Sequence, residues 1–156
     1  MRYFVSLLAL LAVVTTLDLG HAEAQESGFG LGVIVGDPTG LSLKGYAGDL
    51  AIDGAVGFGL IGGNHLAAHV DVLWQPQLAS LNRANMLLHF GVGPKFAIWD
   101  GGDNDGFALG ARVPVGLTFA FTRAPVDVFI EASAGLWIIS NVDFDLDAAV
   151  GARYWF

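Results

Sequence analysis

Apolar side chains recur at every second position along most of this chain, and this period of two constrains the fold more than any other feature. The final segment is the clearest case. One parity is wholly apolar: Phe144, Leu146, Ala148, Val150, Ala152, Tyr154 and Phe156. The other parity holds most of the segment's charges: Asp145, Asp147 and Arg153. Because successive side chains of a β-strand point to opposite faces, the segment predicts a strand with one apolar and one charged face.

The same alternation predicts further strands upstream. They are expected near residues 28–36, 40–47, 52–60, 65–75, 86–98, 107–119 and 126–136, which with 144–156 makes about eight. The connections between them are short and rich in turn-forming residues, as in Asp37-Pro38-Thr39-Gly40 and in residues 76–83. We therefore expect an all-β chain whose consecutive strands pair in antiparallel fashion.

The composition is unusual for a soluble domain. Hydrophobic residues make up 54% of the chain and charged residues only 14%, against roughly 25% charged in an average globular protein. No apolar run after residue 24 is long enough to cross a bilayer as a helix. The remaining way for such a chain to live in lipid is a closed β-barrel, in which every backbone polar group is paired. The net charge of −8 argues against nucleic acid as a partner.

The first residues resemble an export signal rather than part of the fold. A positive start at Arg2 precedes a short apolar run, and Ala22-Glu23-Ala24 supplies a small-x-small cleavage pattern. We expect residues 1–24 to be a signal peptide and residues 25–156 to be a single barrel domain. The chain has no cysteine, which excludes disulfides and thiolate metal sites.

Alternation alone does not say which face of the barrel meets lipid, and a soluble lipocalin-like barrel that binds a ligand also alternates. Here the polar face is made mostly of small residues, which suits a narrow lumen better than a water-facing exterior. Aromatic residues gather at the strand ends, as membrane interfaces favour. One end collects Phe29, Tyr46, Trp74, Phe119, Phe121, Tyr154 and Phe156, and the other collects Trp99, Phe107, Trp137 and Phe144. These features favour an eight-stranded antiparallel up-and-down transmembrane β-barrel.

The final strand, with Val150, Tyr154 and Phe156 on one face, resembles the terminal signal of outer-membrane barrels. The whole chain after residue 24 resembles the small eight-stranded barrels of the OmpA/OmpX-like superfamily. Residues 32–42, Asp53-Gly54 and Asp143-Phe144-Asp145-Leu146 are similar to a family of short outer-membrane barrels of uncharacterised function. The resemblance implies integral location in a bacterial outer membrane and recognition of the last strand by the barrel assembly machinery. It implies no catalytic residue.

Charges of inward parity are expected to form a network in the lumen. They are Lys44, Asp53, Asp71, Lys95, Arg112, Asp127, Glu131, Asp145, Asp147 and Arg153. A turn near Ser140 would place Asp127 opposite Arg153, and Arg112 would lie near Glu131. Pairing is expected because unpaired charges in a tight interior are costly. The network predicts a plug that fills the lumen, and the alternative is a gated ion path.

Three histidines, His65, His69 and His89, share the inward parity with Asp71. If the turn after the fourth strand centred on Ala79, His69 would lie directly opposite His89. Imidazoles so placed are candidate ligands for zinc or copper, and a hydrogen-bonded polar interior is the competing interpretation. The acidic turn that contains Asp100, Asp103 and Asp105 could hold calcium weakly.

The sequence favours a non-catalytic barrel with a structural or envelope-integrity role, without a cofactor and monomeric, since a closed barrel has no free edge. A lipid-modifying outer-membrane enzyme of the deacylase or acyltransferase type is one alternative. No serine after the signal neighbours a histidine in sequence, although nucleophilic catalysis requires a base within reach of the hydroxyl. The soluble lipocalin-like barrel is the other alternative.

Overall fold

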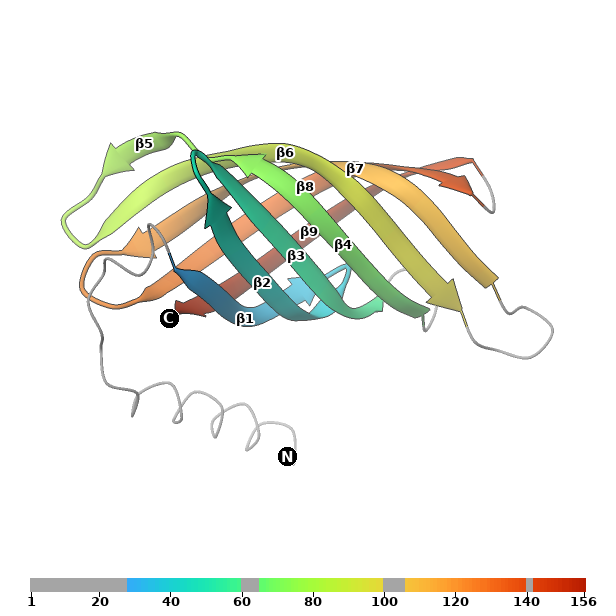
Figure 1. Ribbon diagram of the computed structural model, residues 1–156, viewed down its shortest axis with the longest axis horizontal. Coiled ribbons are helices and arrows are strands. Elements are labelled where there is room, and N and C mark those ends of the chain that lie inside the picture. The colour runs from blue at the N-terminus through green and yellow to red at the C-terminus, as the bar shows by residue number, and fades with distance from the viewer. Residues whose placement is uncertain (1–27, 60–64, 100–105, 140–141) are drawn as a thin grey trace, which may run out of the picture.

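The computed structural model describes residues 28–59, 65–99, 106–139 and 142–156. Within them the chain is all β, and its strands lie strongly tilted around one barrel (Figure 1). The strands are β1 (Phe29–Gly36), β2 (Thr39–Ala47), β3 (Leu50–Gly59), β4 (His65–Trp74), β5 (Gln77–Ser80), β6 (Ala84–Trp99), β7 (Gly106–Phe121), β8 (Val126–Ile139) and β9 (Asp143–Trp155). The expected signal peptide, residues 1–24, and the candidate calcium turn lie outside the described residues.

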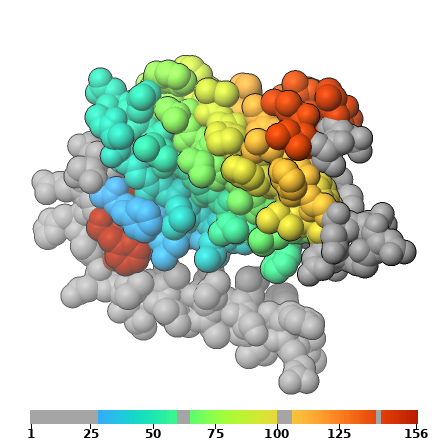
Figure 2. All heavy atoms as spheres, turned by 45° about the vertical axis from the view of Figure 1, so that its right-hand side comes forward, coloured from blue at the N-terminus to red at the C-terminus, as the bar shows by residue number. Residues whose placement is uncertain are grey.

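The sheet closes because its first and last strands pair. Each strand is antiparallel to its neighbour in the order β4-β3-β2-β1-β9-β8-β7-β6, and β4 also pairs with β6. Eight strands therefore form a ring, which confirms the expected up-and-down barrel. Figure 2 shows one side of this wall, where β2, β3, β4, β6 and β7 follow one another. No helix among the described residues is long and apolar enough to cross a membrane.

Two connections show how local sequence closes the hairpins. Gly48 and Asp49 link β2 to β3, and Gly48 has φ +66°, a left-handed conformation that glycine adopts without strain. In the turn between β1 and β2, the Thr39 hydroxyl donates to the Gly36 carbonyl (2.9 Å) and accepts from the Gly36 amide (3.0 Å). The Asp37–Pro38 peptide of this turn is cis. The expected turn at residues 37–40 is thus present, although Thr39 and Gly40 already belong to β2.

The connection over residues 76–83 differs from expectation. Its first part is the short strand β5, which pairs with β6 beyond the last pair of β4, Trp74 with Phe90. The hairpin therefore extends past Pro76 and turns only after Ser80. The register consequently places His69 opposite Lys95, not opposite His89. Pro76 is expected from the sequence to end the strand pairing, because proline has no backbone N–H to donate. In the structure it separates β4 from β5, and both of these strands pair with β6.

The barrel is inside-out compared with a soluble protein. Leucine, isoleucine, valine and phenylalanine side chains dominate the exposed set, whereas the buried apolar set consists largely of alanines. Fourteen polar or charged residues in the described part of the chain are buried, among them Lys44, Arg112 and Arg153. A lipocalin-like barrel requires the opposite arrangement, with an apolar interior. The lipocalin-like alternative is therefore wrong for the part of the chain that the structure describes.

Exposed aromatic side chains lie at both ends of the outer surface. The end that carries the chain's C-terminus has Phe29, Trp74, Phe121 and Phe156, and the opposite end has Phe107 and Phe144. Tyr46 was expected in the first group but lies in the lumen. Its ring stacks on Trp155 at 5.5 Å and its hydroxyl donates to Gln75 Oε1 (3.3 Å). Its parity is that of Lys44, which is the better guide to its position.

Large lumen side chains lie directly across from glycines of the neighbouring strand. Five such cross-strand pairs are Gly30–Trp155, Gly59–His65, Gly116–His89, Gly135–Asp145 and Gly151–Phe129. At each of these glycines, a Cβ atom would run into the partner's side chain. An eight-stranded barrel has little interior space, so a large side chain fits only where the opposite position is empty. The inward glycines therefore leave room in the lumen for the large side chains of their cross-strand partners.

We predict that Gly116→Ala lowers the free energy of unfolding by about 1–3 kcal/mol, the range of overpacking effects. Its Cβ would meet the Ile130 carbonyl oxygen and the His89 ring, and the carbonyl belongs to a paired strand. Gly45→Ala is the matched control, because nothing lies within 4 Å of its Cβ. Urea unfolding of both variants in lipid vesicles measures the difference. Equal unfolding midpoints for the two variants would contradict the proposed role of Gly116.

Candidate functional site

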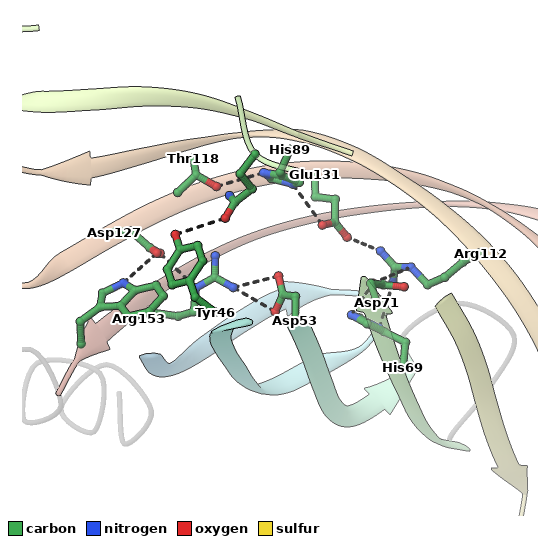
Figure 3. A network of polar contacts seen from close by, with 12 residues as sticks. Tyr46, Asp53, His69, Asp71, His89, Arg112, Thr118, Asp127, Glu131 and Arg153 are labelled. Carbon is green, nitrogen blue, oxygen red and sulfur yellow. Dashed lines mark hydrogen bonds and ion pairs between the residues drawn. The ribbon is translucent and has the colours of Figure 1, made fainter. Parts of the chain in front are cut away.

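The lumen contains every charged residue that the sequence assigned to the inner face. Eight of the ten are buried, and Asp145 and Asp147 are partly buried. Figure 3 shows how part of this set is connected by hydrogen bonds and ion pairs. The charges form three groups along the lumen, centred on Arg153, Arg112 and Lys95.

Arg153 on β9 bridges two carboxylates from different parts of the wall. Its Nη1 donates to both oxygens of Asp53 on β3 (3.0 and 2.9 Å), and its Nε donates to Asp127 on β8 (3.1 Å). Trp155 donates from its indole to the other Asp127 oxygen (2.9 Å). The guanidinium carbon lies 4.2 Å from the centre of the Phe129 ring. Asp127 and Arg153 are direct cross-strand partners, so the contact between their side chains follows from the strand register alone.

Arg112 on β7 is the centre of the second group. Its Nη1 donates to His69 Nδ1 (2.9 Å), its Nη2 pairs with Glu131, and its Nε lies 3.4 Å from Asp71 Oδ2. Glu131 also contacts His89 Nε2 (3.2 Å). The other ring nitrogen of His89 is 3.0 Å from the Thr118 hydroxyl. Thr118, His89, Glu131 and Arg112 thus form one buried chain (Figure 3).

The third group lies nearer the end opposite the chain's C-terminus. Lys95 on β6 pairs with Asp145, and its Nζ is 3.4 Å from Asp147 Oδ2. The same ammonium lies 4.1 Å from the centre of the Trp137 ring. Trp137 in turn donates from its indole to Asp145 Oδ2 (3.0 Å). The ammonium is therefore held by two carboxylates and by a cation–π contact with the Trp137 ring.

Some buried polar atoms have no hydrogen-bond partner among the described residues. They include Lys44 Nζ, Arg153 Nη2 and Ser133 Oγ. Lys44 pairs across the strands with Asp53, but no hydrogen bond joins its ammonium to that carboxylate. Buried polar atoms of this kind are ordinarily satisfied by ordered water.

The metal candidates are only partly brought together. His69 and Asp71 lie with Glu131, so that one ligand atom from each is within 4.8 Å of the others. His89 instead contacts Thr118 and Glu131, and the His65 ring lies against Trp99 at 5.4 Å. The Arg112 guanidinium contacts all three members of the close group. A metal ion at this position would have to replace a cation that the chain itself supplies, and metal binding stays an untested prediction.

Sequence reasoning missed several members of the network. Thr118, Gln75 and Trp155 make hydrogen bonds in the lumen, and Trp137 holds the Lys95 ammonium. Thr118, Trp137 and Trp155 have the inward parity, so the alternation pattern places them in the lumen. Their hydrogen-bond and cation–π partners depend on distances across the lumen, which the pattern does not contain.

A cavity of about 250 Å³ occupies the lumen near the Lys95 group. Its lining includes Asp37 and Pro38 from the turn between β1 and β2, Trp99 at the end of β6, and Asp143 at the start of β9. These positions all belong to the end of the barrel opposite the chain's C-terminus. Lys95, Arg112, His65 and His69 complete its polar lining together with Trp137, Asp145 and Asp147.

Comparison with known proteins adds little. No protein-family model matches this sequence, and no curated protein matches it. Among solved structures, the attachment invasion locus protein Ail of Yersinia pestis is similar to this chain, with 18% sequence identity and a TM-score of 0.38. The match covers 83% of this chain and 94% of Ail. The strand pairing described above, and not this likeness, defines the barrel.

We predict that Arg153→Leu lowers the free energy of unfolding by about 3–5 kcal/mol, because it leaves two buried carboxylates without their cation. Arg123→Leu, at an exposed position between β7 and β8, is the control and should change stability by less than about 0.5 kcal/mol. Urea titration in lipid vesicles, followed by tryptophan fluorescence, compares the two. An Arg153→Leu protein as stable as the control would show that the pair contributes nothing.

Proposed function

We propose that this protein is an integral outer-membrane β-barrel with a non-catalytic, structural role in the cell envelope. The observation that carries the proposal is the inside-out distribution of side chains: large apolar residues cover the outer wall, and the buried charged residues lie in the lumen. In water, each large apolar side chain that stays exposed loses the roughly 1.5–3 kcal/mol of free energy that its burial would contribute to folding. A lipid environment removes that cost, and a closed barrel leaves no unpaired edge in it.

The lumen groups support a plug rather than a pore. In the two buried groups, Arg153 on β9 bonds across the interior to Asp53 on β3, and Arg112 on β7 bonds past β6 to His69 on β4. Near the end that carries the chain's C-terminus, the Tyr46–Trp155 stack lies beside the Arg153 group. Small barrels of eight strands are usually filled by their own side chains. We therefore propose that the lumen stabilises the wall and does not conduct ions.

The lipid-modifying enzyme is the less supported alternative. Thr118, His89 and Glu131 have the order hydroxyl, imidazole and carboxylate that nucleophilic catalysis uses. All three are buried, and none is among the described residues that line the cavity. Glu131 is also committed to Arg112. These contacts favour a structural network over a reactive one.

Strand β9 is our candidate for recognition by the barrel assembly machinery, because its outer face resembles the terminal signal of outer-membrane barrels. Phe156 follows this strand and pairs through its backbone with Phe29 at the closing seam (Phe156 N to Phe29 O, 2.9 Å). Its side chain is 65% exposed on the outer wall. We expect the folded protein to be surrounded by lipid as a monomer.

We predict that Phe156→Ser lowers the amount of protein recovered in the outer membrane severalfold, because it alters the face offered for assembly. Phe144→Ser is the matched control, since Phe144 is also an outward phenylalanine near an end of β9, with an exposure of 61%. Membrane fractionation followed by gel electrophoresis with and without boiling measures both yield and folding. Wild-type protein should show heat-dependent mobility, and its recovery in the soluble periplasm would refute the membrane proposal. Equal losses in both variants would refute the role of Phe156.

We predict that the wild-type barrel adds no resolvable ion channels to a planar lipid bilayer, because the buried charge pairs of Arg112 and Arg153 block its lumen. The triple variant Tyr46→Ala, Arg153→Ala and Trp155→Ala removes the group near the C-terminal end and should produce measurable conductance. A triple variant at outward positions, Val113→Ala, Val115→Ala and Leu117→Ala, controls for general loosening. Stable single channels from the wild-type protein would overturn the plug and favour the ion path.

A further inference from the structure

Two chemically different kinds of side chain line the cavity. His65 on β4, Trp99 on β6 and Trp137 on β8 contribute ring surfaces, and the first two rings contact each other at 5.4 Å. The acidic side chains are Asp37, Asp143, Asp145 and Asp147. β9 supplies three of these four aspartates, and the turn after β1 supplies the fourth. Aromatic faces therefore lie around the same space as a run of carboxylates.

The charges that line the cavity do not balance. Its lining contains four aspartates but only two permanent cations, Lys95 and Arg112. Arg112 already has Asp71 and Glu131 as partners, and neither of these belongs to the lining. Among the described lining residues, Lys95 alone is therefore left to balance the four aspartates. The described lining of the cavity thus carries an excess of negative charge.

Lys95 shows how this cavity holds a cation. Its ammonium sits between the Trp137 ring, 4.1 Å from the centre, and the carboxylates of Asp145 and Asp147. Attraction by an aromatic face and by carboxylates acts on the same group from different sides. A second cation in the cavity would meet the same two kinds of surface, offered by Trp99 and by the aspartates that Lys95 leaves unpaired.

We propose that this cavity is a binding site for a small organic cation with a flat or apolar flank. The carboxylates take the charge, and the rings of Trp99 and Trp137 cover the flank. A volume of about 250 Å³ is below the roughly 300–1,000 Å³ of pockets for drug-sized ligands, so the ligand is a small molecule. This site goes beyond the structural role proposed above and is independent of it.

The test is isothermal titration of the folded full-length barrel, in detergent micelles, with benzyltrimethylammonium chloride. Sodium benzenesulfonate is the probe of opposite charge, and empty micelles give the blank. We expect saturable binding of the cation and none of the anion. The double variant Asp37→Asn and Asp143→Asn should weaken cation binding by roughly threefold or more, as the loss of two nearby charges predicts. Asp49→Asn is the matched control, because Asp49 is an exposed aspartate at the opposite end of the barrel.

A second variant adds a gain of binding. Lys95→Met removes the resident cation and frees Asp145 and Asp147, so benzyltrimethylammonium should bind more tightly than to the wild type. Heat-dependent gel mobility establishes that each variant is folded before titration. The proposal is overturned by any of four results: absence of saturable binding, equal binding of the anion, unchanged affinity in the double variant, or no gain in Lys95→Met. Calcium chloride that displaces the probe at equal concentration would likewise overturn it, in favour of an inorganic cation site.

Discussion

Closure of the sheet is the constraint on which the rest of this structure depends. The pairing of β1 with β9 removes the free edge that an open sheet of this kind would present. Once the wall is closed by eight strands, its interior is narrow, and every second residue must fit into it. The outer wall is then free to be apolar, since its backbone groups are already paired. The side-chain distribution, the small residues and the paired charges all follow from this geometry.

In the narrow lumen, charged side chains from different strands come close enough to pair with one another. Arg153 joins β9 to β3 and β8, and Arg112 joins β7 to β4 and β8. The contacts with Asp53 and Asp71 join strands that are not neighbours, whereas backbone hydrogen bonds join only neighbouring strands. The lumen side chains therefore connect parts of the wall that the backbone does not connect. A charged interior is costly only when its members are unpaired, and most charged groups in the lumen contact an opposite charge.

Much of the fold could be predicted from the sequence because a period of two has one structural meaning. The alternation identified the inward face at Lys44, Arg112 and Arg153, and the cross-strand pair of Asp127 with Arg153 followed from a short turn. The register of His69 could not be predicted, because it depended on where the hairpin after Pro76 turns. Contacts such as Lys95 with Trp137 join strands that are not neighbours. A one-dimensional pattern contains no information about distances across a lumen, which depend on tilt and closure.

The glycines that face His65, His89 and Trp155 have a consequence for how such a barrel can diverge. A larger residue at one position of such a pair requires a smaller residue at the other, so the two positions are expected to change together. Exchanging the two residues keeps their total side-chain volume in the lumen, whereas a single larger residue increases it. Among relatives of this chain, inward positions should therefore show correlated changes of size between neighbouring strands, while outward positions drift independently among apolar residues.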